Sequence, residues 1–238
     1  MTSPELSVVA PLHDEDAVAA ALARRCAAAA RRTGRTWELI LVDDGSTDRT
    51  ASVLEAAGVP LRLVRLPACR GQWGATREGL ARARGRAVVV LDGDLQDPPE
   101  LIPRLVEAWD GAPEAAVFAV KMCRRDPAWF RMGVLGYTAM QAVLGARIPR
   151  GAGSYSVLPG PVAARLARLD ISDANLAAAV VALGVPTRTV PYARDARVQG
   201  SSRVGPAGLV REALGSLWLL SPPGRRHVVG RCGGGDHG

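Results

Sequence analysis

Hydrophobic and polar positions alternate along the first half of the chain in a pattern that predicts strands and helices in turn. Short apolar runs, typical of strands covered on both faces, are separated by longer stretches with helical character. We expect strands at 6–10, 37–42, 61–66, 87–91 and 115–120, and helices at 16–32, 48–57, 71–83 and 97–109. Pro11 is expected to end the first strand and Asp97 to cap the last of these helices. This order predicts a single α/β domain with a mostly parallel sheet sandwiched by helices.

The second half of the chain has a less regular pattern. It predicts helices at 127–144, 161–168 and 173–183, an extended segment at 151–158 and a strand at 185–192. The basic, Gly-rich stretch 194–208 is typical of a mobile loop. An apolar-rich helix at 209–220 is followed by Ser221-Pro222-Pro223 and a Gly-rich tail. We therefore expect the main domain over residues 1–208, and an amphipathic helix with a flexible tail over residues 209–238.

Composition and charge narrow the classes of partner. Hydrophobic residues make up 48% and charged residues 22% of the chain, which excludes wholesale disorder. The net charge is +7, carried by 29 Arg and a single Lys, Lys121. GC-biased codon usage accounts for much of this Arg content, and attraction to nucleotides, phosphorylated substrates or an acidic membrane is the functional interpretation. The aromatic residues do not interleave with Arg, so nucleic acid is not expected as a partner.

The sequence also predicts a compartment. No apolar run reaches the ~18 residues of a membrane-spanning helix, and the first residues lack the pattern of a secretory leader. The four cysteines (26, 69, 123 and 232) have no metal-type spacing, and the three histidines form no local zinc cluster. These features predict free thiols in a reducing, cytoplasmic setting. The apolar stripe of 209–220 predicts contact with the cytoplasmic membrane face or a partner, with packing on the protein's own core as the alternative. Homo-oligomerisation is left open.

Two acidic clusters follow predicted strands and carry the candidate chemistry. Asp92-Gly93-Asp94 comes directly after a buried strand, where two neighbouring carboxylates suit a divalent cation that also binds substrate phosphates. Gly93 would let the backbone approach a ligand closely. The second cluster, 43–48, also follows a strand; Asp43 could fix its turn and Asp48 could cap the next helix. Because ligands bind beyond the carboxyl ends of parallel strands, we expect the two clusters to face one crevice.

These motifs resemble family 2 glycosyltransferases with the GT-A fold. The resemblance rests on Pro11-x-x-x-Glu15, on Val42-Asp43-Asp44-Gly45-Ser46-Thr47-Asp48, and on Asp92-Gly93-Asp94-Leu95-Gln96-Asp97-Pro98-Pro99-Glu100. The last stretch is similar to polyprenyl-phosphate sugar transferases, including dolichol-phosphate mannose synthase. The likeness continues through Lys121, 124–126, 129–131 and 197–203, and covers residues 6–220. It implies transfer of a sugar from a nucleoside diphosphate donor with inversion at the anomeric carbon.

The resemblance also implies a role for each matching residue. Those expected to bind the nucleotide-sugar are Pro11, His13, Glu15, Val42, Asp44, Asp92, Gly93, Arg197 and Arg203. Those expected to hold Mg²⁺ or Mn²⁺ are Asp94, Gln96 and Asp92. Lys121 and Arg131 would receive the acceptor phosphate, and Asp173 lies near the position of a carboxylate base in other members. Asp173 could instead be the N-cap of the helix at 173–183.

The chain also departs from the family's pattern. His13 stands where relatives often have Tyr, and Gly151-Ala152-Gly153 replaces a segment that often carries an acidic residue. Pro159 stands where an Arg is common and Leu135 where some relatives have Ser. Many bacterial relatives continue into two transmembrane helices. These departures leave the donor side intact and keep the acceptor open.

A polyprenyl phosphate is the expected acceptor, and the donor could be a UDP-, GDP- or TDP-linked sugar. The main alternative is a glycosyltransferase that acts on a hydroxyl or amine of a small molecule, for which Asp173 would be essential. A nucleotidyltransferase would want a Gly-rich basic loop after the first strand, which residues 11–16 lack. A non-catalytic binding protein would not require the Asp92/Asp94 pair.

Overall fold

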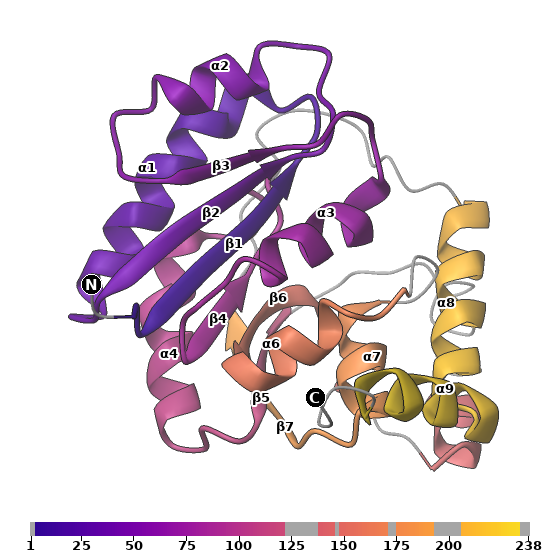
Figure 1. Cartoon of the computed structure of the whole chain (residues 1–238). Coiled ribbons are helices and arrows are strands. Elements are labelled where there is room, and N and C mark those ends of the chain that lie inside the picture. The colour runs from indigo at the N-terminus through magenta and orange to yellow at the C-terminus, as the bar shows by residue number, and fades with distance from the viewer. Residues whose placement is uncertain (1–2, 122–137, 146–147, 171–174, 193–205, 234–238) are drawn as a thin grey trace.

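The computed structural model describes residues 3–121, 138–145, 148–170, 175–192 and 206–233. Its centre is a seven-stranded sheet with the order β3-β2-β1-β4-β6-β5-β7 (Figure 1). All neighbouring pairs are parallel except those of β6, which runs antiparallel to both β4 and β5. The strands are β1 (Leu6–Leu12), β2 (Trp37–Asp43), β3 (Arg62–Arg65), β4 (Ala87–Val90), β5 (Ala116–Lys121), β6 (Ala152–Pro159) and β7 (Thr187–Tyr192). The mostly parallel α/β architecture predicted from the sequence is confirmed.

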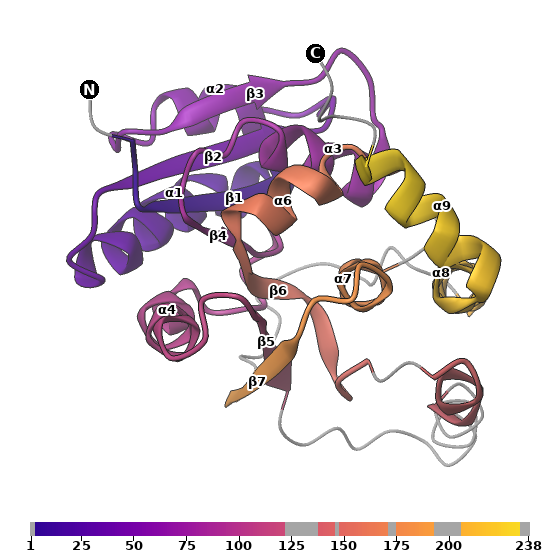
Figure 2. The ribbon, with the colours of Figure 1, turned by 60° about the horizontal axis from the view of Figure 1, so that its bottom comes forward.

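Helices cover both faces of the sheet (Figure 2). They are α1 (Asp16–Arg32), α2 (Thr50–Glu55), α3 (Gly71–Leu80), η1 (Pro99–Leu101), α4 (Ile102–Asp110), α6 (Gly160–Leu166), α7 (Leu176–Ala182), α8 (Pro206–Leu220) and α9 (Pro222–Gly233). Residues 138–143 are also helical. One core lies between the sheet and α1, α2 and α4, and a second between the sheet and α3, α6 and α7. None of the described helices is long and apolar enough to cross a membrane.

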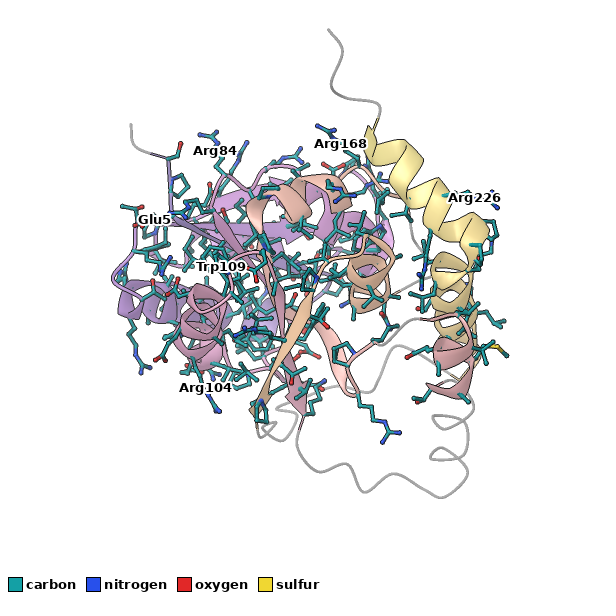
Figure 3. The ribbon with its side chains drawn as sticks, turned by 90° about the horizontal axis from the view of Figure 1, so that it is seen from below. Glu5, Arg84, Arg104, Trp109, Arg168 and Arg226 are labelled. Atoms are coloured by element: carbon teal, nitrogen blue, oxygen red, sulfur yellow. The ribbon has the colours of Figure 1, made fainter. Side chains whose placement is uncertain are left out.

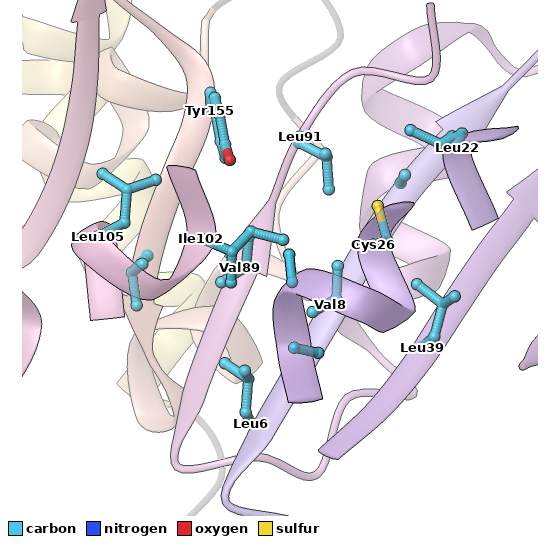
Figure 4. Packing of buried hydrophobic residues seen from close by; sticks show 14 of the residues in the cluster. Leu6, Val8, Leu22, Cys26, Leu39, Val89, Leu91, Ile102, Leu105 and Tyr155 are labelled. Atoms are coloured by element: carbon cyan, nitrogen blue, oxygen red, sulfur yellow. The ribbon is translucent and has the colours of Figure 1, made fainter. Parts of the chain in front are cut away.

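Alternating residues of the central strands supply these two cores. Val8 and Val89 belong to the α1/α4 side, shown in Figure 4, whereas Val9 and Val88 belong to the α3/α6 side. All four side chains are at most 1% exposed. Strands that bury both faces read as continuous apolar runs, which explains why the sequence pattern located them.

Pro11 does not end β1, contrary to the sequence prediction. The strand continues to Leu12, and Pro11 lies in register with Val42 of β2. The Val9 carbonyl oxygen accepts a hydrogen bond from Leu91 N, on the side of β1 that faces β4. Backbone groups two residues apart in a strand point to the same side, so the nitrogen of Pro11 also faces β4. The β1–β4 ladder has already ended at Val9, so no partner is lost.

The C-terminal region differs from the predicted helix and flexible tail. Helix α8 begins at Pro206, before the predicted boundary at residue 208, and residues 222–233 form the further helix α9. Ser221 Oγ accepts from Gly224 N at 3.3 Å, and Pro222 occupies the first helical position, where its missing N–H costs nothing. Ser-Pro-Pro is thus the start of a helix as well as the end of one. Val228 is fully buried against α7 and α8.

Candidate active site

The predicted site residues lie at the carboxyl edge of the sheet. His13 follows β1, Asp44 follows β2, the 92–94 segment follows β4, and Lys121 ends β5. Because β6 runs in the opposite direction, its first residues reach the same edge, and Ala152 pairs with Val120. Five separate parts of the chain therefore meet at one edge, and four of them are the strand ends that the sequence predicted for a parallel sheet.

Asp43 and Asp44 have separate tasks in the turn after β2. Asp43 Oδ1 accepts from Ser46 N at 3.0 Å, which confirms that Asp43 fixes this turn. Asp44 is 3% exposed; its Oδ1 accepts from Arg70 N at 2.7 Å, and its Oδ2 accepts from the Cys69 thiol at 3.3 Å. The loop before α3 therefore closes over Asp44. A carboxylate held in this way has a fixed direction in which to meet a ligand.

The segment after β1 is tied to the same turn. His13 Nδ1 donates to the Asp44 carbonyl oxygen at 2.8 Å, so a neutral ring carries its lone pair on Nε2. Glu15 N donates to Thr50 Oγ1 at 2.8 Å. Asp48 accepts from Thr50 N at 2.8 Å through Oδ1 and from the first residue of α1 through Oδ2. The N-cap position of α2 is Arg49, with no side-chain cap, so Asp48 does not take the predicted cap position; its carboxylate instead connects the first residues of α1 and α2.

Asp92 is held by two donors that come from distant parts of the chain. Its Oδ1 accepts from Gln72 Nε2 in the first turn of α3 at 2.7 Å and from Ser154 Oγ in β6 at 2.6 Å. The pKa of Asp92 is raised to about 6: desolvation is the main cause, the Ser154 hydrogen bond lowers the pKa, the charges of Asp97 and Asp94 raise it, and Lys121 lowers it. The carboxyl group is therefore half-protonated near pH 6.

Gly93 is required by packing within the protein. A Cβ at this position would lie 2.4 Å from Pro11 O and 2.9 Å from Leu12 Cγ. The segment after β4 therefore rests directly on the end of β1, which places Asp92 and Asp94 beside the segment that carries His13. The close approach predicted for Gly93 is to the end of β1.

Asp94 lies in a tight turn that shapes its neighbourhood. Asp94 Oδ1 accepts from Gln96 N at 3.1 Å, and Leu95 between them has a left-handed φ of 57°. The Gln96 side chain is 7% exposed. A non-Gly residue with positive φ is uncommon and is often found where function requires a particular turn.

Asp97 does not cap the following helix, contrary to the sequence prediction. It is 2% exposed, accepts a short hydrogen bond from Tyr192 OH and lies 3.8 Å from Lys121 Nζ. Pro98 occupies the cap position of η1, with no side-chain cap hydrogen bond. Asp97 therefore joins the ends of β5 and β7 to the acidic segment, since Lys121 and Tyr192 are paired in register.

The donor set at this edge fits the Mg²⁺ or Mn²⁺ that the resemblance implies. Desolvation is the main cause of the raised pKa of Asp92, and repulsion by Asp97 and Asp94 adds to it. Hard divalent cations bind through one or two protein carboxylates and complete their shell with water and substrate phosphates. A cation there would relieve the repulsion that Lys121 relieves only in part.

Several predicted site residues have a different placement or lie outside the described residues. The Val42 and Pro11 side chains are buried in the sheet, so their main chain is what a ligand could reach. Asn175 is the N-cap of α7, and its Oδ1 accepts from Ala178 N at 2.7 Å. This excludes Asp173 as the cap of that helix. The predicted residues outside the described part of the chain are Arg131, Asp173, Arg197 and Arg203.

Sequence reasoning missed four residues that contact the site: Gln72, Ser154, Cys69 and Tyr192. Each lies far along the chain from the carboxylate it contacts, and only the strand order brings them together. One signal was available, because Gln72 and Cys69 flank the start of α3 and therefore lie at the carboxyl edge. The antiparallel direction of β6, which brings Ser154 there, has no local signal.

The sheet, its two helical layers and the carboxylates at its carboxyl edge define the GT-A class of glycosyltransferase fold. Residues 7–158 match the family model described as glycosyl transferase family 2, and the chain therefore belongs to that family.

Curated relatives agree with this assignment. The undecaprenyl-phosphate 4-deoxy-4-formamido-L-arabinose transferase of Pseudomonas paraeruginosa is 45% identical over 130 residues, which cover 53% of this chain and 38% of that protein. The uncharacterised glycosyltransferase YkcC of Bacillus subtilis is 28% identical over 204 residues, covering 84% of this chain and 63% of the relative. The chain thus matches about two fifths of the length of the Pseudomonas relative.

Solved structures share the fold at low sequence identity. Glucosyl-3-phosphoglycerate synthase from Mycobacterium tuberculosis, in complex with phosphoglyceric acid, has a TM-score of 0.58 and 20% identity, covering 99% of this chain and 82% of that one. Mannosyltransferase PcManGT from Pyrobaculum calidifontis, in complex with GDP-Man and Mn²⁺, has a TM-score of 0.57 and 19% identity, covering 98% and 74%. At this identity the likeness establishes the fold alone.

Proposed function

We propose that this chain transfers a sugar from a nucleoside diphosphate sugar to a polyprenyl phosphate, with inversion at the anomeric carbon. The observation that carries the proposal is the pair Asp92 and Asp94 at the carboxyl edge, with the basic Lys121 at the end of β5 on the same edge. The curated relatives named as undecaprenyl-phosphate sugar transferases support the choice of acceptor.

The chemistry separates into a donor side and an acceptor side. Asp44 and His13 would bind the nucleoside, and Asp92 and Asp94 would hold the divalent cation. A bound Mg²⁺ or Mn²⁺ supplies positive charge that stabilises the departing nucleoside diphosphate. The bond between the anomeric carbon and the diphosphate oxygen breaks as the acceptor phosphate oxygen forms its bond on the opposite face.

Lys121 would hold the acceptor phosphate on the other side of the carboxylates. A phosphate monoester has a second pKa of ~6 and is largely ionised at neutral pH, so no strong base is required. The ammonium group of Lys121 is a compact point charge suited to a phosphate oxygen. A hydroxyl or amine acceptor would instead require a carboxylate base.

A transfer assay tests this proposal directly. The chain is incubated with undecaprenyl phosphate and UDP-, GDP- or TDP-sugars, with and without Mn²⁺, and lipid-linked sugar is measured by mass spectrometry. We expect a product with one class of nucleotide, and only with the cation present. Cation-dependent consumption of the donor with no lipid product, together with transfer to a small hydroxyl or amine compound, would favour the alternative acceptor.

Substituting Lys121 separates the acceptor role from donor binding. Lys121→Ala should abolish most transfer, and Lys121→Arg should keep part of it. The comparison is made at pH 8, where Asp92 is ionised with or without its basic neighbour. Arg84→Ala is the matched control, because Arg84 is an exposed base in the turn before β4, on the same side of the molecule as Glu5 (Figure 3). Wild-type transfer by Lys121→Ala would place the acceptor phosphate elsewhere.

A lipid acceptor also requires contact with a membrane surface, and the exposed apolar side chains of α8 could make that contact. Large hydrophobic side chains that are at least half exposed occur, within the described residues, only in residues 138–143 and in α8: Met140, Val143, Leu214 and Trp218. Arg211 is exposed one turn before Leu214. Arg225 Nη2 of α9 donates to Leu144 O at 2.9 Å, which joins α9, the helix after α8, to the end of the segment 138–143.

The sequence left open whether α8 packs on the protein or on a membrane. One face of α8 is buried in the protein, and the opposite face is exposed. Ser216, Leu219 and Leu220 are buried, and Ser216 Oγ accepts from Asn175 N at 3.2 Å. We infer that the opposite face, with Leu214 and Trp218, rests on anionic lipid. Flotation with anionic vesicles should carry the chain upward, and the double variant Leu214→Ser/Trp218→Ser should stay below. Equal flotation of the variant, or flotation with neutral vesicles alone, would contradict this inference.

A further inference from the structure

Three potential metal ligands of different kinds meet at the nucleotide side of the sheet edge, apart from Asp92 and Asp94. His13 follows β1, Asp44 follows β2, and Cys69 lies in the loop between β3 and α3. The ends of these three strands lie side by side in Figure 1. One ligand atom from each residue lies within 4.8 Å of the other two. Within the described part of the chain, no other group of three His, Cys, Asp or Glu residues meets this criterion.

The three side chains form the donor set that zinc prefers. Imidazole nitrogen, thiolate sulfur and carboxylate oxygen together suit a borderline-soft ion, whereas Mg²⁺ and Mn²⁺ prefer oxygen ligands alone. Asp44 Oδ2 and Cys69 Sγ are 3.3 Å apart. Two ligands at zinc distances of ~2.0 and ~2.3 Å in a tetrahedral arrangement would be about 3.5 Å apart. The observed separation is therefore close to that of a bound pair.

The surrounding hydrogen bonds already orient the ligands. Arg70 N–H binds Asp44 Oδ1 at 2.7 Å, which leaves Oδ2 directed at the thiol. His13 Nδ1–H donates to the Asp44 carbonyl oxygen, which fixes the ring, and His13 Nε2 lies 3.5 Å from Asp14 Oδ2. Metal-binding histidines commonly make such a hydrogen bond to a backbone carbonyl, which fixes the tautomer.

Backbone packing keeps Cys69 beside Asp44 although the cysteine is exposed. Gly45 has a φ of +63°, and a Cβ there would lie 2.7 Å from both Ala68 C and Cys69 N. The turn after β2 is thus in direct contact with the main chain that carries the thiol. An exposed thiol in a fixed position is accessible to a metal ion from solvent.

We propose that His13, Asp44 and Cys69 form a Zn²⁺ site whose fourth ligand is water, and that zinc bound there excludes the nucleoside of the donor. In the free protein the Cys69 thiol donates a hydrogen bond to Asp44 Oδ2. Zinc binding releases the thiol proton to solvent. The zinc site itself stands on the three side chains. The exclusion of the nucleoside rests on the proposed function, because His13 and Asp44 are the residues assigned to the nucleotide.

Direct metal binding tests the site. Zinc affinity is measured by competition with a fluorescent zinc chelator for the wild-type chain and for Cys69→Ala, His13→Ala and Cys26→Ala. We expect one zinc ion per chain, and an affinity at least about tenfold lower in the first two variants. Cys26 is the matched control, because its thiol is buried in α1 and desolvation raises its pKa to about 12. Circular dichroism checks that each variant is folded. Unchanged zinc affinity in both Cys69→Ala and His13→Ala overturns the site.

Nucleotide binding tests the exclusion separately. Affinity for UDP, GDP and TDP is measured in the presence of Mn²⁺, with and without one equivalent of Zn²⁺. We expect zinc to weaken nucleotide binding to the wild-type chain and to have little effect on Cys69→Ala. Equal nucleotide affinity with and without bound zinc overturns the exclusion. If no nucleotide binds under either condition, the proposed function fails and the exclusion fails with it, while the chelator experiment still decides the zinc site.

Discussion

Removing one hydroxyl group, in Ser154→Ala, should shift the pH dependence of cation binding. Asp92 must be ionised to bind a divalent cation, and protons compete for it below its pKa of about 6. Ser154 Oγ–H donates to Asp92 Oδ1 at 2.6 Å and favours the ionised form. The variant loses this donor while Gln72 Nε2 remains at 2.7 Å. The pKa of Asp92 should therefore rise.

The size of the shift follows from the strength of the lost hydrogen bond. A hydrogen bond to a charged group contributes about 1.5–3 kcal/mol, and about 1.4 kcal/mol corresponds to one pKa unit. Because Asp92 keeps its second donor and is partly exposed, we take the lower end and expect the pKa to rise by about 1. The ionised fraction at pH 6.5 should then fall about threefold, whereas at pH 8 it should change little.

Isothermal titration of the chain with Mn²⁺ and donor nucleotide, from pH 5.5 to 8.5, measures this shift. The wild-type affinity should fall below pH ~6, and the Ser154→Ala profile should move to higher pH with the same upper plateau. Ser156→Ala is a control, since Ser156 Oγ donates to the Ser154 carbonyl oxygen at 3.0 Å, whereas the side-chain donors to Asp92 are Ser154 and Gln72. A uniform loss of affinity at every pH, or overlapping profiles, would refute the assignment of Asp92 as the titrating ligand.

Three further predictions concern the stability of the folded chain. Asp92→Asn should raise the free energy of unfolding at pH 7, because the pKa of Asp92 in the folded chain lies above its ordinary value of 3.8. The wild-type chain has the stability that comes from protonated Asp92 below pH ~4 and loses it as the pH rises through about 6. The gain in the variant should therefore vanish in acid. Gly93→Ala should cost about 1–3 kcal/mol in urea unfolding, because its Cβ would lie 2.4 Å from Pro11 O, whereas Gly153→Ala, with open space around it, should cost little. Asn175→Ala should lose about 1 kcal/mol of stability through its cap of α7; a denaturation midpoint equal to wild type would contradict that role.

The central sheet could be predicted from the sequence because its strands are buried on both faces. Residues 87–90 are a continuous apolar run for this reason, and the predicted strand at 87–91 differs from β4 by one residue. Proline positions were less reliable as predictors of where strands and helices end. Pro11 lies inside β1, and Pro222 begins a helix, because in each case the missing N–H had no partner to lose. That circumstance depends on the neighbouring strand or cap, which a local pattern does not reveal.

The candidate site could be predicted in its acidic parts and not in its supporting contacts. Asp44, Asp92 and Asp94 follow apolar runs, so their position at the carboxyl edge comes directly from strand order. Asp97 has the sequence context of a helix cap, yet its partners are Lys121 and Tyr192 on other strands. No spacing along the chain indicates these contacts. The parallel pairing of β5 with β7 brings Lys121 and Tyr192 to Asp97, and the antiparallel β6 brings Ser154 to Asp92.

The same three-dimensional arrangement explains why the lone lysine lies where it does. Asp97 is buried beside Asp92, so its charge destabilises the ionised form of the neighbour that a cation would use. Lys121 lies 3.8 Å from Asp97 and lowers the pKa of Asp92. One ammonium group thus helps keep the carboxylates ionised and stands on the edge where an acceptor phosphate would arrive. A loss of transfer in Lys121→Ala at pH 8 reports the acceptor role, whereas a loss confined to pH values near 6 reports the effect on Asp92.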